Sequence, residues 1–126
     1  VDPRDPTRYG PARTVTVMPA DRPRYLGPVR LLISDLTISA GETFTEAMMG
    51  RKPSPSRIGS TTQGVFSDDM ERNLPNDWTF TLGNEDYVAP DGQNYEGVGI
   101  PPTTQIQVFT PAEVTPHQDS ALSMPW

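Results

Sequence analysis

The segment Ser39-Ala40-Gly41-Glu42 places a hydroxyl group and two small residues shortly after an apolar stretch that ends at Asp35. If that stretch is a strand and Ser39 opens a helix, the hydroxyl lies beside backbone N–H groups that lack partners at the positive helix end. Acyl transfer needs a nucleophile in such a place, because the attacked carbonyl oxygen becomes negative and the Ala40 N–H is the natural first donor to it. The segment is therefore a candidate nucleophile turn.

The same four residues also have a simpler interpretation. Ser-x-x-Glu is the pattern of a capping box, in which the Ser39 side chain accepts from the Glu42 N–H and Glu42 accepts from the Ser39 N–H. Taken by itself, the motif favours a helix cap over a nucleophile. One serine can also serve as both.

Two acidic pairs are the remaining clusters that could bind a metal, Asp68-Asp69 and Glu85-Asp86. Neither comes with histidine or with a defined spacing of oxygen ligands, so we expect solvated loop charges and assign no metal and no cofactor. The chain has no cysteine, which excludes a thiolate nucleophile, a disulfide framework and a cysteine zinc site.

The basic loop with Arg51, Lys52 and Arg57 could receive the terminal carboxylate of a peptide, but surface charge beside prolines more often serves solubility alone. The single histidine, His117, stands in a polar stretch between two polar or proline neighbours. We expect it to be a surface histidine rather than a catalytic base.

Length and composition favour one folded domain or part of one. The chain has 126 residues with 15 prolines and 10 glycines, and its formal net charge of −6 would repel nucleic acid and anionic membrane surfaces. No apolar run approaches the roughly 20 residues that a membrane span requires. The first residue is valine and no signal peptide is recognisable, so we expect a fragment or a processed chain.

The apolar pattern predicts an α/β arrangement around the candidate turn. Residues 28–35 have a continuous apolar centre, which is typical of a strand covered on both faces. Residues 40–49 lack proline and carry Phe44, Ala47 and Met48 at helical spacing, which predicts a helix that packs this stripe on the sheet and stops at Gly50.

Other elements follow from shorter patterns. We expect an extended arm over residues 1–13, strands over 14–18, 57–60, 78–82 and 104–109, and a polar tail over 111–126. Alternation of Trp78, Phe80 and Leu82 with threonines predicts one buried face, with a turn that pairs this strand to residues 87–88. The charged residues from Asp68 to Arg72 predict a solvated loop.

Several short motifs occur in a fixed order: YLGPV at 25–29, LLISDLTISAGE at 31–42, RIGSTTQG at 57–64, YVAPDG at 87–92 and YEGVGIPP at 95–102. Over residues 24–109 the chain resembles the serine peptidases of the carboxyl-terminal processing (tail-specific) and tricorn core type. The resemblance implies the C-terminal part of a Clp-protease or crotonase-like core of β-β-α units, spanning residues 14–110.

The resemblance also indicates a branch. In the processing-protease branch a lysine just after the glycine turn acts as general base, but Val65 occupies that position here. The tricorn-like branch uses a histidine supported by a glutamate in the segment that matches residues 95–99, so Glu96 is implied in that role. Thr103 departs from the aspartate that is frequent in the family.

The resemblance thus implies a peptidase that forms an acyl-enzyme on Ser39, with the Ala40 N–H in the oxyanion hole and Glu96 supporting a histidine from a segment outside this chain. The isolated chain is expected to be inactive, to act on peptide or unfolded protein only within its parent, and to associate with the remainder of that parent or with itself. A periplasmic or extracellular location is favoured by the resemblance alone. The alternative is a noncatalytic ligand-binding module, because the same fold includes retinoid-binding repeats.

Overall fold

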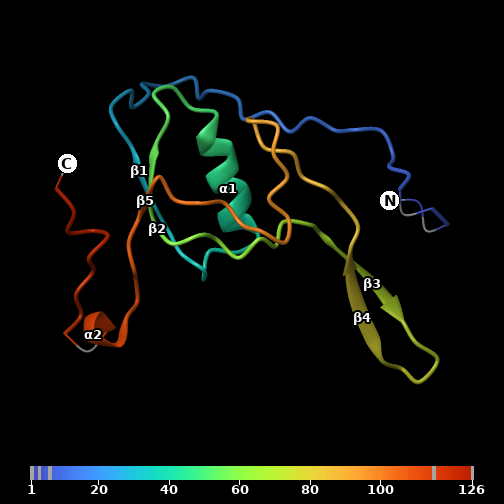
Figure 1. The fold of residues 1–126 in the computed structure, drawn as a ribbon. Coiled ribbons are helices and arrows are strands. Elements are labelled where there is room, and N and C mark those ends of the chain that lie inside the picture. The colour runs from blue at the N-terminus through green and yellow to red at the C-terminus, as the bar shows by residue number, and fades with distance from the viewer. Residues whose placement is uncertain (1, 3, 6, 115, 126) are drawn as a thin grey trace.

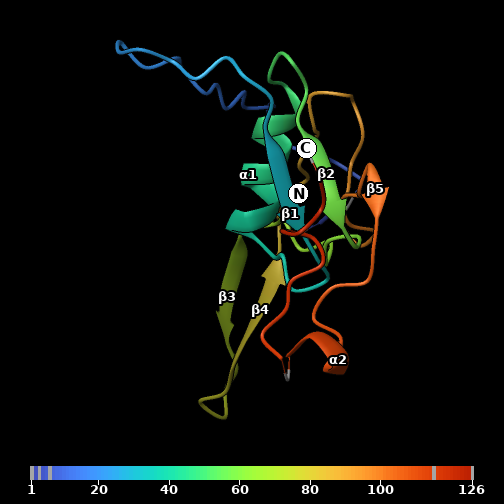
Figure 2. The same ribbon diagram turned by 90° about the vertical axis from the view of Figure 1, so that its left-hand side faces the viewer.

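The computed structural model describes residues 2, 4–5, 7–114 and 116–125. Its centre is a parallel sheet with the order β1-β2-β5, formed by β1 (Arg30–Ile33), β2 (Ser56–Gly59) and β5 (Thr104–Gln105). The pairing of β1 with β2 runs from Arg30↔Ser56 to Ile33↔Gly59. Helix α1 (Ala40–Met49) connects these two strands and lies on one side of the sheet (Figures 1 and 2). The α/β class expected from the sequence is confirmed.

The buried apolar residues come from strands and from the loops that cross beneath them. They are Leu31, Ile33, Ile58, Phe66, Ala89, Ile100 and Ala121. Ile100 has no exposed surface at all. Gly59 is required at the end of β2, since its φ is +129° and a Cβ there would stand 1.9 Å from the Ile33 carbonyl oxygen.

Strand β1 is shorter than predicted and is covered on one face only. Leu31 and Ile33 are buried, but Leu32 between them is 46% exposed. Its continuous apolar sequence therefore does not reflect burial on both faces. The Leu32 side of the strand instead lines a pocket under the C-terminal segment.

Helix α1 has the predicted bounds, with Gly50 as its C-cap, and the Arg51 N–H donates to the Met48 carbonyl at 3.0 Å just after it. The predicted packing face is wrong, however. The buried residues are Glu42, Thr45 and Glu46, whereas Phe44 is 59% exposed. Acidic side chains can lie inward here because backbone N–H groups of a neighbouring loop satisfy one of them, as described below.

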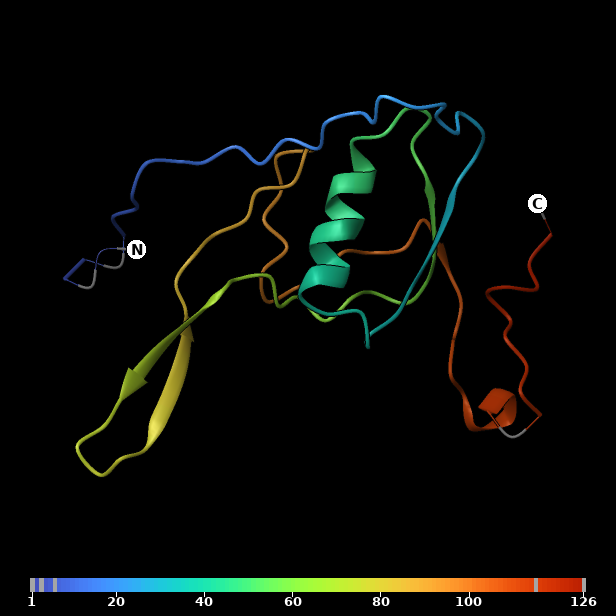
Figure 3. The same cartoon turned by 180° about the vertical axis from the view of Figure 1, so that it is seen from behind.

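A two-stranded antiparallel hairpin, β3 (Asp69–Asn73) and β4 (Thr79–Gly83), extends away from the sheet (Figures 1 and 3). Two predictions fail here, because the expected solvated loop is strand β3 and β4 pairs with it rather than with residues 87–88. The register puts Met70 opposite Leu82 and Arg72 opposite Phe80. No residue of β4 is buried, so the expected buried face is also wrong.

The predicted strand over residues 14–18 does not form, and these residues are exposed coil. No strand in the described part of the chain lies against them, and a strand without a partner leaves its backbone groups unpaired. The predicted final strand is reduced to β5, since the chain after Ile106, whose N–H still donates to the Gly59 carbonyl, leads away to the short helix α2 (Pro111–Val114). No helix in the described residues is long and apolar enough to cross a membrane.

The C-terminal segment returns to β1. The Arg30 guanidinium donates to the Met124 carbonyl at 2.9 Å and also to the Pro125 carbonyl, and Ala121 is buried. Figure 2 shows the segment after α2 beside the sheet, in front of β1 and β2.

Candidate active site

Ser39 stands directly before α1, in the connection from the end of β1. Its side chain is exposed, and its φ of 52° and ψ of −117° are unusual for a residue with a side chain. The connection is itself held by local bonds, because the Ser34 N–H donates to Thr37 Oγ1 at 3.0 Å and the Thr37 N–H donates to the Ser34 carbonyl at 2.9 Å. The Ser39 N–H donates to the Val65 carbonyl at 3.0 Å, which fixes the turn from outside the helix.

Ala40 is the first residue of α1, and its N–H differs from those that follow it. The next three N–H groups of the helix are satisfied, since Gly41 donates to the Ile38 carbonyl while Glu42 and Thr43 donate to the Ser39 carbonyl. Among the described residues no acceptor is recorded for the Ala40 N–H. This N–H, beside the serine at the positive end of the helix dipole, is suited to an oxyanion.

Glu42 lies at the candidate site, and the sequence indicated it only as a capping partner. It has no exposed surface, and its carboxylate accepts from three backbone N–H groups: Gly64 at 2.6 Å, Val65 at 2.8 Å and Ser39 at 3.2 Å. Only the Ser39 contact belongs to the capping box. The other two donors lie more than 20 residues later, and no local pattern signals them.

Glu96 is half-buried and is bound to the same loop on its other side. Its Oε2 accepts from the N–H groups of Phe66 and Ser67, both at 3.0 Å. Ser39 and Glu96 are therefore both hydrogen-bonded to the segment 64–67. No hydrogen bond between the two side chains is recorded among the described residues.

The turn that carries Glu96 is closely packed on this segment. Gly97 donates to the Gly64 carbonyl at 2.7 Å, and a Cβ on Gly64 would stand 2.7 Å from the Gly99 nitrogen. Tyr95 precedes Glu96 in this turn. Burial, together with the hydrogen bond that its hydroxyl donates to Asp91 Oδ2 at 2.7 Å, raises the pKa of Tyr95 to about 12. Tyr95 thus remains a neutral hydrogen-bond donor at physiological pH, and its bond to Asp91 stabilises the loop between these two residues.

A base for Ser39 is not found in the part of the chain that the structure describes. His117 is exposed and lies just after α2, where its N–H donates to the Val114 carbonyl. Val65, at the position that the family resemblance assigns to a lysine base, is apolar. Glu46, one turn after Glu42, is a buried carboxylate whose Oε1 has no partner in the described chain, and burial, with the charges of Asp91 and Glu42, raises its pKa.

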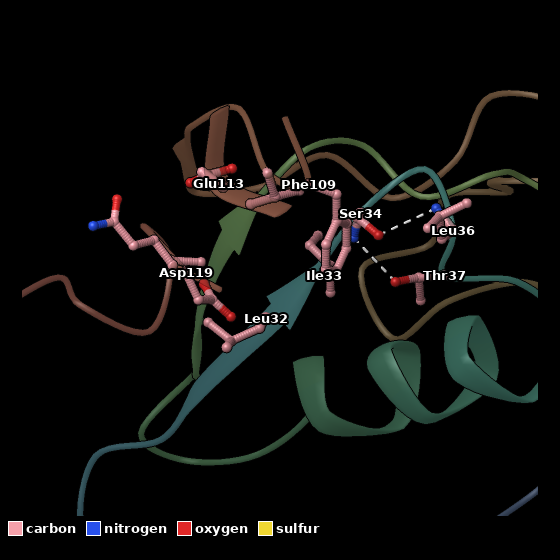
Figure 4. Close-up of a pocket in the computed structure, with 11 residues that line it drawn as sticks. Leu32, Ile33, Ser34, Leu36, Thr37, Phe109, Glu113 and Asp119 are labelled. Carbon is pink, nitrogen blue, oxygen red and sulfur yellow. Dashed lines mark hydrogen bonds between the residues drawn. The ribbon is translucent and has the colours of Figure 1, made fainter. Parts of the chain in front are cut away.

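A pocket of about 340 Å³ lies beside the connection that leads to Ser39 (Figure 4). It is lined by Leu32, Ile33, Ser34, Leu36, Thr37, Val108, Phe109, Glu113, Gln118, Asp119 and Ala121. The C-terminal segment closes one side of it, so sequence patterns within residues 28–42 could not indicate it. Within the described residues, no group of three or more histidine or acidic side chains could hold a metal ion.

The model of peptidase family S41 matches residues 3–106 of the chain. The fold, with a serine between a parallel strand and the helix that follows, is that of a serine-type peptidase segment. More particularly, the chain belongs to peptidase family S41. The resemblance to this peptidase family that the sequence indicated is thereby confirmed.

Solved structures of similar fold include a candidate peptidase from Parabacteroides merdae, which is 27% identical with a TM-score of 0.73 over 86% of this chain and 33% of that one. Mature CPAF in complex with lactacystin is 21% identical, with a TM-score of 0.65 over 76% of this chain and 19% of that one. The photosystem II D1 C-terminal processing protease is 21% identical, with a TM-score of 0.51 over 64% of this chain and 20% of that one. None of the curated proteins compared with the chain matches it.

The chain thus spans about a third or less of the length of these solved proteins. The likeness to the two proteins that are 21% identical shows only that they share the α/β fold with this chain. What the whole protein acts on, and which of its residues act, belong to the proposals that follow.

Proposed function

We propose that this chain supplies the nucleophile half of a serine peptidase site, in which Ser39 attacks the peptide carbonyl and the Ala40 N–H stabilises the oxyanion. The observation that carries the proposal is the exposed serine beside the one first-turn N–H of α1 for which no acceptor is recorded in the described chain. The family membership supports hydrolysis of peptide bonds as the reaction. The substrate is a peptide or an unfolded protein segment.

The attack requires a base for the Ser39 proton. Because Val65 cannot accept a proton, we infer a histidine from a segment outside these residues, as in the tricorn-like branch. Glu96 would stabilise the charged form of that histidine through its negative charge. The isolated chain should then be inactive.

The direct assay is covalent labelling of the whole protein by a fluorophosphonate, which reports the reactive serine. Ser39→Ala should abolish labelling, and the exposed Ser54→Ala, beyond the other end of α1, should leave it unchanged. Labelling of Ser39→Ala at the rate of the unmodified protein would refute the assignment of the nucleophile. Turnover by the 126 residues alone, lost in Ser39→Ala, would instead show that the base lies within this chain.

Glu96→Gln separates a charge role from a structural one. Because one oxygen of Glu96 accepts both backbone N–H groups, the amide oxygen of glutamine can retain both bonds while the charge is lost. We expect unchanged thermal stability with a labelling rate lower by on the order of 10²–10⁴, by analogy with loss of the carboxylate in a catalytic triad. Equal labelling rates would remove Glu96 from the proposed site.

A noncatalytic ligand-binding module is the competing function, and the pocket beside residues 34–37 offers it an apolar space. That function predicts no fluorophosphonate labelling of the whole protein. The first assay therefore distinguishes the two.

A further inference from the structure

The carboxylate of Glu42 joins the two segments that meet at the candidate site. Its Oε1 accepts from the Gly64 N–H, and its Oε2 accepts from the N–H groups of Val65 and Ser39. Gly64 and Val65 belong to the glycine turn, and Ser39 belongs to the nucleophile turn. One side chain in the first turn of α1 therefore fixes the distance between these two turns.

Helix capping alone does not account for this arrangement. The capping contact to Ser39 is the longest of the three at 3.2 Å, while the bonds to Gly64 and Val65 are 2.6 and 2.8 Å. A cap at a helix end can remain in water, whereas Glu42 is fully buried. Removing a carboxylate from water is unfavourable unless hydrogen bonds to it compensate, and the loop supplies two of the three.

The same loop connects Glu42 to the Glu96 side of the site. Val65 contributes its N–H to Glu42 and its carbonyl to the Ser39 N–H, and the next two N–H groups bind Glu96. Displacement of the loop from Glu42 would thus disturb the backbone of Ser39 directly. It would also alter the spacing between Ser39 and Glu96.

We propose that Glu42 is a positioning residue for the nucleophile: it holds Ser39 at its positive φ and keeps the Ala40 N–H turned away from internal acceptors. This inference rests on the proposed function of Ser39. Glu42 is not itself a catalytic residue, because it has no exposed surface with which to touch a substrate. Its effect passes through the backbone of Ser39 and of Val65.

Glu42→Gln in the whole protein tests the proposal. A glutamine has one acceptor oxygen, so its NH₂ must face either the Gly64 N–H or the pair from Val65 and Ser39, and at least one of the three bonds is lost. We expect fluorophosphonate labelling to slow by about tenfold or more, and kcat on a peptide to fall more than KM changes. The fraction folded, measured by circular dichroism, is needed beside each rate.

Glu46→Gln is the matched control, since Glu46 lies one turn further along α1 and is buried, yet no hydrogen bond to its Oε1 exists in the described chain. Its labelling rate should equal that of the unmodified protein. An equal loss of labelling in both variants, or a loss in Glu42→Gln no larger than its loss of folded protein, would reduce Glu42 to a structural role and overturn the proposal.

A second measurement does not depend on activity or on a folded variant. In the unmodified protein, through-hydrogen-bond NMR couplings should join the Glu42 carboxyl carbon to the amide nitrogens of Gly64 and Val65. Absence of these couplings would overturn the inference even if Ser39 labels. If the couplings are present but Ser39 does not label, the proposed function fails while the geometry around Glu42 stands.

Discussion

Replacing Gly64 by alanine tests the packing that brings the two sides of the candidate site together. Gly64 has a φ of +83°, and a Cβ there would meet the Gly99 nitrogen at 2.7 Å and the Val98 nitrogen at 2.8 Å. Gly92 provides a matched comparison, because its φ is +82° and a Cβ added to it would meet nothing within 4 Å in the described chain. The two substitutions share a positive φ and differ in the contact.

The magnitudes follow from these two terms. A left-handed φ costs a residue with a Cβ about 1–2 kcal/mol, which applies equally to Gly64→Ala and Gly92→Ala. The contact at Gly64 involves backbone atoms that cannot rotate away, and overpacking of this kind costs a further ~1–3 kcal/mol. Gly64 also donates to Glu42 and accepts from Gly97, so a shift would weaken both bonds.

Urea unfolding followed by circular dichroism gives the comparison. With a slope of roughly 1–3 kcal/mol per molar urea, Gly64→Ala should have a midpoint lower than that of Gly92→Ala by about 1 M. In the whole protein, Gly64→Ala should also slow labelling of Ser39, and Gly92→Ala should not. Equal midpoints with equal slopes would show that the turn at residues 97–99 yields freely, and that Gly64 serves only its own φ.

Three other predictions concern the body of the chain. Burial raises the pKa of Glu46 above the ordinary 4.5 of a glutamate, so the folded state binds the proton more tightly and stability declines as pH rises above that value. Glu46→Gln should flatten this decline in urea midpoint, and parallel curves for the two proteins would contradict it. Ile100→Ala should lower the free energy of unfolding by about 2–5 kcal/mol in the same assay. Leu26→Ala, at an exposed position, should lower it by less than about 0.5 kcal/mol, and similar losses in the two variants would place Ile100 outside the core. Because Phe44 and Trp78 are exposed, the isolated chain should associate with copies of itself or with the rest of its parent, and light scattering that shows a stable monomer at micromolar concentration would count against it.

The parts of the fold that the sequence predicts are those decided within a few neighbouring residues. Helix α1 follows from a proline-free stretch between Ser39 and Gly50, and both of its ends agree with the structure. The position of Ser39 at the helix start follows from the same local pattern. Strand β1 is recognisable because its apolar residues are contiguous and flanked by turn residues. Strand β2 (Ser56–Gly59) lies within one residue of the strand predicted over residues 57–60.

What could not be predicted depends on distant partners. The inward face of α1 is acidic because the Gly64 and Val65 N–H groups reach Glu42, and nothing within residues 40–49 indicates those donors. The charged residues of β3 favour a loop when the sequence is considered locally. The strand forms through its pairing with β4, which puts Met70 and Arg72 on a common face with Leu82. The prediction that Phe44 packs on the sheet is wrong because apolar spacing identifies a helix face but does not indicate whether another element covers it.

The competition between a helix cap and a nucleophile turn can be argued further from the backbone of Ser39. A residue that only caps a helix usually adopts dihedral angles of the β region, which are free of strain. Ser39 has a φ of 52°, and its N–H is held by the Val65 carbonyl, which lies outside the helix. Strained angles of this kind persist when surrounding contacts impose them, and they concentrate at functional sites. Glu42 performs its part of the capping box and also imposes that strain, so the two interpretations describe one turn, in which the cap is part of what would present the hydroxyl.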